Sequence, residues 1–264
     1  MKSQLHPGLV SITFRQLSAG EVVDLARQAG LAGIEWGGDV HVPHGDLNSA
    51  REVAQRTADA GLNTSAYGSY YRGPQSEKNG PPFETVLETA VALDAPMIRV
   101  WPGHLGSAEA AQEGMRPAIV KQLHRVCELA AEAKIGIGLE FHQNTLTDTN
   151  ASAAELVREI DHPNLTLFWQ PINGAAAQHC LEGLHRLLPH ISNLHVFHWT
   201  FDADGQRTVH PLADGTSAWS QYLAEVRTHG GDRTRSASLE FVRDNDPQQF
   251  LLDAATLKTW LSHA

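Results

Sequence analysis

The stretch Ile135-Gly-Ile-Gly-Leu-Glu140-Phe-His142-Gln-Asn144 predicts a short buried strand that leads directly into a polar loop. Side chains alternate between the two faces of a strand, so Glu140 and His142 share one face with the two glycines, and the apolar residues occupy the other face. The apolar face needs a layer of helices, whereas the glycine face fits a narrow interior. A buried carboxylate is costly unless it is paired or bound to a metal. Taken alone, Glu140 also fits a salt-bridged core residue, so its role depends on how the other strands end.

Similar segments recur on both sides of this stretch and alternate with helix-like segments. The predicted strands span residues 9–14, 34–36, 63–71, 97–101, 135–140, 165–170, 191–199 and 236–242, and the longer loops span residues 73–82, 102–115 and 200–216. Parallel strands need crossover connections, and eight strand–helix units in 264 residues match a closed (β/α)8 TIM barrel. The alternative is an open doubly wound sheet, but no Gly-x-Gly-x-x-Gly follows the first strand. The sequence therefore predicts an α/β fold with a single domain over residues 1–264.

Composition limits the classes of function. The formal net charge of -10 argues against nucleic acid or an anionic membrane as the main partner, because both favour a basic protein surface. The two cysteines, Cys127 and Cys180, are not spaced as a metal or redox motif and suggest a reducing compartment. No segment approaches the roughly 18 apolar residues of a membrane span. We therefore expect a cytoplasmic protein that acts on small molecules.

The last four predicted strands all end in a residue that can bind a metal, namely Glu140, Gln170, His198 and Glu240. The alternation directs these side chains toward the mouth at the carboxyl ends of the strands, where barrels of this kind carry their active sites. The same alternation directs His195 toward the helix layer. Two carboxylates, one imidazole and one amide oxygen predict one divalent metal ion, Mn²⁺ before Mg²⁺, Co²⁺ or Zn²⁺. The alternative is a polar barrel mouth without a metal.

Several motifs then point to a known superfamily. They are Gly33-Ile-Glu-Trp-Gly-Gly, Ile98-Arg-Val-Trp, Leu139-Glu-Phe-His, Leu194-His-Val-Phe-His198 and Ser238-Leu-Glu240. In order and spacing they resemble the xylose isomerase-like TIM barrel superfamily, in its branch of sugar phosphate isomerases/epimerases, tagatose-3-epimerase-like proteins and inosose dehydratases. The resemblance covers nearly the whole chain.

The resemblance implies a set of metal ligands. In that family the metal is held by Glu, Asp, His and Glu from the last four strands, which implies Glu140, His198 and Glu240 as ligands here. Gln170 stands where the family has Asp, and Asn173 stands where it has His three residues later. An amide oxygen can bind a metal but supplies no charge, so the two replacements point to a subgroup with its own metal affinity or chemistry.

The resemblance also implies an activity, a metal-dependent isomerase or epimerase of a sugar or sugar derivative. The metal would polarise a carbonyl of the sugar or polyol, and Glu140 and Glu240 would exchange protons with the neighbouring carbon. Two alternatives stay open: a lyase that dehydrates a keto-polyol on the same scaffold, and a non-catalytic sugar-binding barrel. The multi-zinc endonuclease branch is disfavoured because residues 200–216 contain no Asp-x-His. The oligomeric state stays open, and a homo-oligomer is compatible with the sequence.

Six residues near the predicted strand ends are candidates for substrate binding: His142, Asn173, Trp36, His41, Trp101 and Arg207. A tryptophan can stack on a sugar ring, a histidine or asparagine can hydrogen-bond hydroxyl groups, and Arg207 can hold a phosphate or carboxylate. A packing or surface role is the alternative for each of them. Arg99 is expected to point inward and to pair with a core acid such as Glu35.

Overall fold

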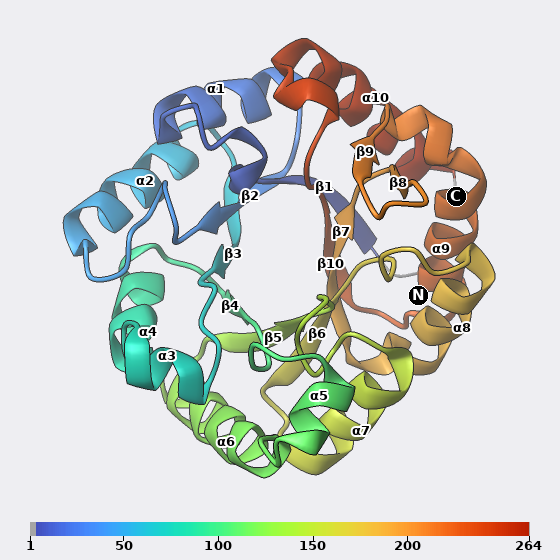
Figure 1. Cartoon of the computed structure of the whole chain (residues 1–264). Coiled ribbons are helices and arrows are strands. Elements are labelled where there is room, and N and C mark those ends of the chain that lie inside the picture. Colours follow the sequence, from blue (N-terminus) through green and yellow to red (C-terminus); the bar gives the residue numbers. More distant parts are fainter. Residues whose placement is uncertain (1–3, 264) are drawn as a thin grey trace.

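Eight parallel strands close into a barrel in the computed structural model, which describes residues 4–263 (Figure 1). Around the barrel the strands follow the order β1-β10-β7-β6-β5-β4-β3-β2, and β1 pairs with both β10 and β2. Their bounds are Gln4–Val10 (β1), Gly33–Gly37 (β2), Asn63–Gly68 (β3), Met97–Val100 (β4), Gly136–Glu140 (β5), Leu165–Trp169 (β6), Ile191–Val196 (β7) and Thr234–Leu239 (β10). This arrangement confirms the predicted (β/α)8 TIM barrel. Of the predicted domain, residues 1–3 and 264 lie outside the described range.

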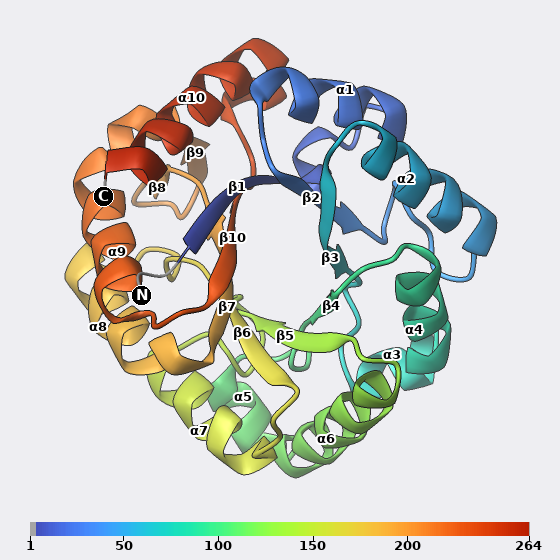
Figure 2. The same cartoon turned by 180° about the vertical axis from the view of Figure 1, so that it is seen from behind.

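A ring of helices covers the outside of the barrel (Figures 1 and 2). The main helices are Ala19–Ala29 (α1), Leu47–Asp59 (α2), Phe83–Ala92 (α4), Arg116–Glu132 (α6), Asn150–Ile160 (α7), Ala177–Leu187 (α8), Thr216–His229 (α9) and Pro247–His263 (α10). Helix α1 shows why they form: Val22, Val23 and Ala26 recur with helical spacing and are buried. A capping box starts this helix, because Ser18 accepts from the backbone N–H of Glu21 and the Glu21 carboxylate accepts from the backbone N–H of Ser18.

Some local elements differ from the sequence prediction. Strand β1 ends at Val10, and Ser11–Phe14 forms a 3-10 helix where a strand was predicted. The three predicted loops contain short elements, which are α3 (Pro74–Asn79), α5 (Ser107–Gln112) and the antiparallel hairpin of β8 (Trp199–Phe201) and β9 (Arg207–Val209). Elements of three to six residues are too short to produce a recognisable hydrophobic period.

The barrel interior is narrow, and glycines make room for its large side chains. A Cβ atom at Gly138 would lie 2.2 Å from the ring of Phe168. A Cβ atom at Gly68 would lie 2.6 Å from the Arg99 guanidinium and 3.1 Å from the Glu35 carboxylate. The glycine face predicted for β5 therefore lies inside the barrel, where it leaves space for an aromatic ring beneath a group of charged side chains.

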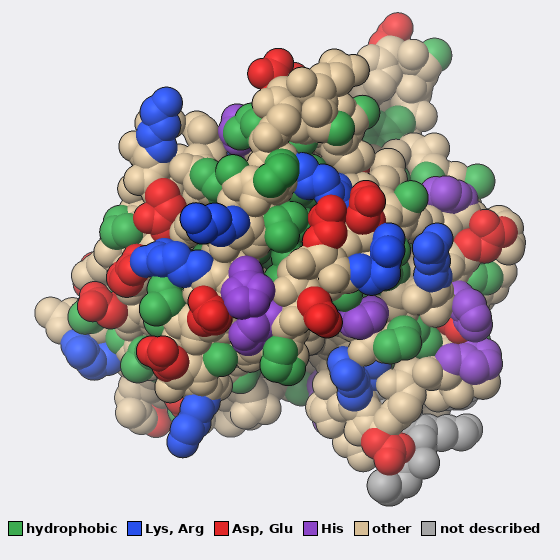
Figure 3. All heavy atoms as spheres, turned by 90° about the horizontal axis from the view of Figure 1, so that it is seen from below, with side chains coloured by type: hydrophobic (Ala, Val, Ile, Leu, Met, Phe, Trp, Pro, Cys, Tyr) green, Lys and Arg blue, Asp and Glu red, His purple; other side chains and the backbone are tan. Residues whose placement is uncertain are grey.

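The two ends of the barrel differ. Figure 1 looks onto the mouth, where the strands end and the β8–β9 hairpin lies in front of the barrel, and Figure 2 shows the opposite end, where the chain enters β1. On the flank in Figure 3, acidic and basic side chains are interspersed, and apolar side chains are scattered between them. Within residues 4–263, no helix has both the length and the apolar character needed to cross a membrane.

Candidate functional site

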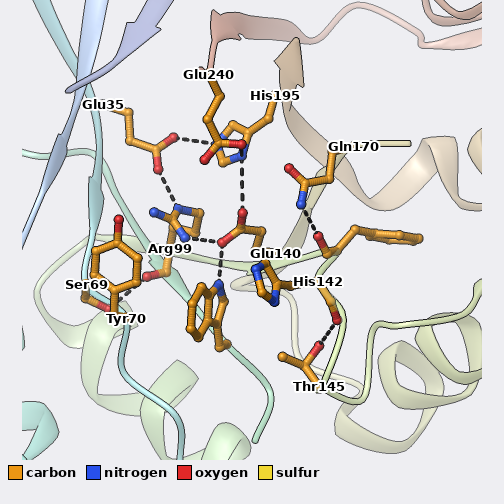
Figure 4. Close-up of polar contacts among 12 residues, drawn as sticks. Glu35, Ser69, Tyr70, Arg99, Glu140, His142, Thr145, Gln170, His195 and Glu240 are labelled. Atoms are coloured by element: carbon orange, nitrogen blue, oxygen red, sulfur yellow. Dashed lines mark hydrogen bonds and ion pairs between the residues drawn. The ribbon is translucent and has the colours of Figure 1, made fainter. Parts of the chain in front are cut away.

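Two glutamates and a histidine meet inside the barrel, close to the mouth. Glu140 ends β5, Glu240 directly follows β10, and His195 comes from β7. One ligand atom from each side chain lies within 4.8 Å of the other two, and all three residues are buried. Figure 4 shows their polar groups turned toward one another. The fold thus brings the two predicted glutamates together in one site.

The histidine of this cluster is His195, where the sequence predicted His198. The Nδ1 atom of His195 lies 3.4 Å from a carboxylate oxygen of Glu140 and 3.5 Å from one of Glu240. The prediction that His195 faces the helix layer is therefore wrong. His198 lies beyond the end of β7, half-buried beside Gly215 and near the ring of His210. Sequence reasoning chose the wrong one of two nearby histidines because it placed β7 in the wrong phase.

Arg99 on β4 connects this cluster to Glu35 on β2. Its Nε donates to a Glu35 oxygen at 2.5 Å, and its Nη1 donates to Glu140. The other oxygen of Glu35 lies 2.9 Å from His195 Nε2. The indole N–H of Trp101 also donates to Glu140. These contacts confirm the predicted pair of Arg99 and Glu35. The hydrogen bonds from Arg99 and Trp101 also hold the Glu140 carboxylate in place.

The two glutamates of the cluster have opposite pKa shifts. Burial by itself would raise the pKa of Glu140, but attraction to Arg99 and His195 holds that pKa well below its usual range. Burial raises the pKa of Glu240 to about 7, despite attraction to His195 and with a contribution from the nearby charge of Glu140. Neighbouring carboxyl groups with separated pKa values are the arrangement that acid–base chemistry near neutral pH requires.

The residues of this network fit a divalent metal ion. His195 Nδ1 is buried and has no hydrogen-bond partner among the described residues, while Nε2 faces the Glu35 carboxylate. A carboxylate behind the far ring nitrogen is the usual way in which a metal-bound histidine is oriented. With all three buried glutamates ionised, they and Arg99 carry two excess negative charges, which a divalent ion beside a neutral His195 would balance.

The side-chain oxygen of Gln170 is a further, uncharged candidate ligand for this metal ion. Its Nε2 donates to the backbone carbonyl of Phe141 at 2.5 Å, which orients the amide. Its Oε1 is buried and has no hydrogen-bond partner within the described part of the chain. Figure 4 shows this hydrogen bond, which joins Gln170 to the residue directly after Glu140. An oriented amide oxygen without a partner fits the predicted role of a fourth, uncharged ligand.

A cavity of about 230 Å³ lies next to Gln170 and is lined by His142 and Asn173, among others. The ring of His142 stacks on Trp101 with 4.3 Å between centroids. Asn173 Oδ1 accepts from the indole N–H of Trp199 at 3.1 Å. Three predicted substrate residues, His142, Asn173 and Trp101, therefore lie at or beside one cavity formed by the loops after β5 and β6.

Two other predicted substrate residues, Trp36 and His41, pack apart from the charged cluster. Trp36 is completely buried, and its indole donates to Thr57 on α2 at 3.2 Å, so it packs between the barrel and the helices. His41 packs near the Trp36 ring, and its Nε2 lies 3.1 Å from the carbonyl of Leu17. Because Glu35 points inward, its neighbour Trp36 must point outward. Contrary to the prediction, neither residue reaches the charged cluster.

Arg207 lies on the hairpin at the mouth. Its guanidinium carbon is 4.7 Å from the ring centroid of Trp199 and 4.8 Å from that of Phe241, the residue directly after Glu240. Among residues 4–263, no acidic side chain forms an ion pair with Arg207. A guanidinium held over two aromatic rings without an acidic partner is available to bind an anionic group of a ligand.

Comparisons with known proteins agree with this architecture. Residues 23–259 match the family model described as xylose isomerase-like TIM barrel. The chain is 30% identical to a 3-dehydroshikimate dehydratase of Bacillus anthracis, over 90% of this chain and 91% of that protein. The crystal structure of the probable 3-DHS dehydratase AsbF, involved in the petrobactin synthesis from Bacillus anthracis, has a TM-score of 0.77 and 26% identity, covering 97% of this chain and 98% of that one. A D-allulose 3-epimerase from Methylomonas sp. has a TM-score of 0.71 at 14% identity, covering 98% of each chain, which shows the fold alone.

Proposed function

The chain belongs to the xylose isomerase-like TIM barrel family, and we propose that it is a lyase that removes water from a hydroxylated cyclic ketone bearing a carboxylate. The relative named 3-dehydroshikimate dehydratase supports this reaction over the isomerisation or epimerisation expected from the sequence. The lyase was the alternative prediction. Both reactions begin with removal of a proton from the carbon next to a carbonyl, so the same site suits either of them.

The similarity to the dehydratase carries the choice of reaction, and the different contacts of the two glutamates support Glu240 as its base. Glu140 receives hydrogen bonds from Arg99 and Trp101, so it is fixed as a carboxylate. Within the described residues, the one ion-pair contact of the Glu240 carboxylate is His195 at 3.5 Å. In the proposed reaction Glu240 takes the proton from the carbon next to the carbonyl. The hydroxyl on the following carbon then leaves with that proton as water, a carbon–carbon double bond forms, and Glu240 returns to its starting state.

The other residues of the site hold and orient the reactants. A divalent ion bound by Glu140, His195 and Glu240, with Gln170 as a neutral ligand, would supply the positive charge that polarises the substrate carbonyl. Glu35 keeps His195 in the orientation that leaves Nδ1 free for binding. His142 and Asn173 line the adjoining cavity and are placed to bind hydroxyl groups of the substrate.

The product decides between the candidate functions. Purified protein would be incubated with 3-dehydroshikimate and related hydroxylated keto acids in deuterated water, and the products would be weighed by mass spectrometry. We expect a product that has lost one water. A product of unchanged composition that has gained solvent deuterium would establish the isomerase or epimerase instead. That second candidate is favoured by the placement of the two carboxylates on β5 and after β10, from which they approach one point. Binding without exchange or turnover would indicate a binding barrel.

Removal of divalent metal is expected to abolish turnover. Without the ion, the excess negative charge of the glutamates opposes the build-up of negative charge on the substrate oxygen. Activity would be measured after dialysis against a chelator and again after addition of Mn²⁺ or Mg²⁺, with the metal content followed by elemental analysis. Full activity in protein that contains no metal would contradict this part of the proposal.

Replacement of Arg207 by glutamine is expected to raise KM by about 10- to 100-fold with little change in kcat, because a charged hydrogen bond contributes about 1.5–3 kcal/mol and Arg207 would contact the carboxylate remote from the reacting carbon. Steady-state kinetics of Arg207→Gln would be compared with those of Arg158→Gln, which removes an exposed arginine on α7. Equal KM values in the two variants would rule out the contact.

A further inference from the structure

A second group of metal-binding side chains lies on the outer surface, on two neighbouring helices. It consists of His185 near the end of α8, and Glu225 and His229 in the last two turns of α9. Both imidazoles approach the same oxygen: Nδ1 of His185 lies 2.6 Å from Glu225 Oε1, and Nδ1 of His229 lies 3.0 Å from it. One ligand atom of each residue lies within 4.8 Å of the other two. We propose that these three residues bind one zinc ion, independently of the site inside the barrel.

The donor set and its spacing fit zinc. Zinc is bound by imidazole nitrogen and carboxylate oxygen at about 2.0–2.2 Å, so tetrahedral ligand atoms lie about 3.3 Å apart. The nitrogen–oxygen distances of 2.6 Å (His185) and 3.0 Å (His229) need to open by about 0.7 Å and about 0.3 Å to reach this spacing. The rings can move by these amounts because the side chains of His185 and His229 are 64% and 53% exposed. Three protein ligands leave the fourth position for water, as in many zinc sites.

The surroundings of the cluster also favour a cation. The carbonyl groups at a helix C-terminus carry partial negative charge, and both histidines lie in the last turn of their helix. The Glu225 side chain is only 15% exposed, which fixes the carboxylate between the two rings. Glu225 and His229 are four residues apart and so lie on one face of α9, while His185 completes the set from α8. A bound zinc ion would link α8 to α9.

This site lies at the other end of the barrel from the charged cluster. In β/α units the helices run opposite to the strands, so helix C-termini lie at the end where strands begin. Glu140 and Glu240 lie where strands end. Occupancy of the outer site is therefore expected to change stability but not turnover.

The test is the number of zinc ions bound per chain. Tag-free protein would be stripped of metal, titrated with zinc in equilibrium dialysis and analysed by elemental analysis, for wild type, His185→Asn, His229→Asn and His124→Asn. His124 is the matched control, because it faces Glu128 at 3.7 Å with the same four-residue spacing and does not belong to a three-residue group within the described chain. We expect wild type and His124→Asn to bind one more zinc ion per chain than either of the other variants.

Thermal unfolding gives a second readout. Zinc at about 100-fold above its dissociation constant is expected to raise Tm by about 5 °C more in wild type than in His229→Asn, because a ligand that binds only the folded state stabilises it. Equal zinc stoichiometry in wild type and both cluster variants would overturn the proposal, and the three residues would then form only a hydrogen-bonded group. The comparison does not depend on the inner site, because the difference of one ion persists whether or not the barrel interior takes up zinc.

Discussion

The variant Glu240→Gln is expected to turn over substrate about 10³-fold more slowly than the wild type while keeping its fold. The amide has nearly the same shape as the carboxylate but cannot accept the proton, and general acid–base catalysis contributes about 10²- to 10⁴-fold. Glu240 is buried, and its ion-pair contact with His195 is 3.5 Å long. The substitution therefore removes the negative charge without breaking a short hydrogen bond. The measurement is kcat under saturating substrate, with thermal unfolding as the check on folding.

Metal content separates two explanations for such a loss. Glu240 is also a member of the candidate metal triad, so each variant would be analysed for bound metal before the assay. A matched control is Glu128→Gln, because Glu128 is 59% exposed on α6 and distant from the site. Near-normal kcat in metal-loaded Glu240→Gln would remove Glu240 from the proposed reaction. Loss of activity together with loss of metal would assign Glu240 to metal binding alone.

The variant Arg99→Met is expected to lower the free energy of unfolding by about 3–5 kcal/mol, because it leaves two buried carboxylates without their shared cation. Arg99 is 1% exposed and pairs with both Glu35 and Glu140. For a chain of this length, about 2–4 °C of Tm is lost per kcal/mol, so a fall of roughly 10 °C is expected. Chemical denaturation of the purified protein measures the free energy directly.

A double variant tests the cause of this instability. In Arg99→Met/Glu35→Gln one of the two unpaired charges is removed as well, so part of the lost stability is expected to return. If the double variant is less stable than Arg99→Met by the full cost of Glu35→Gln alone, the two residues do not interact energetically. That result would mean that the charge of Glu35 has no part in the stabilisation by Arg99, which would then come from Glu140 or from packing.

The fold was predictable because its signal is repeated along the chain. Each strand–helix unit gives the same pattern of apolar strand, helix and turn, so errors at single elements do not change the topology. Glu140 at the end of β5 and Gln170 directly after β6 also lie at strand ends, as predicted, because both strands are short apolar segments; their binding of a metal stays a prediction. The pairing of Arg99 with Glu35 followed from the cost of burying either charge alone.

The phase of β7 was not predictable from alternation. Leu194 and Val196 are both completely buried, as residues on either face of a barrel strand can be, so the apolar pattern does not distinguish inside from outside. The pairing of β6 with β7 also shifts register between Leu167 and Phe168, and sequence gives no sign of this irregularity. A signal for His195 was nevertheless present. Three inward-facing glutamates, Glu35, Glu140 and Glu240, beside the single cation of Arg99 require another cationic or metal-binding partner inside the barrel.

The prediction for Trp36 failed for a different reason. Its position near a strand end suggested the mouth, but the residue before it, Glu35, was already expected to point inward toward Arg99. Consistent use of the strand period would have placed Trp36 against the helices, where it donates to Thr57. The position of a residue along a strand determines the height of its side chain in the barrel. The two-residue alternation of side chains determines whether that side chain faces the interior.

The charged network also connects the two halves of the chain unequally. Arg99 and Glu35 belong to the first four strands and neutralise each other, so this half of the chain can bury its charges unaided. In the second half, Glu140 depends on Arg99 from the first half, and His195 reaches across to Glu35. The charges of the second half of the barrel are therefore balanced only in the presence of the first half, whereas Arg99 and Glu35 need no partner from the second half.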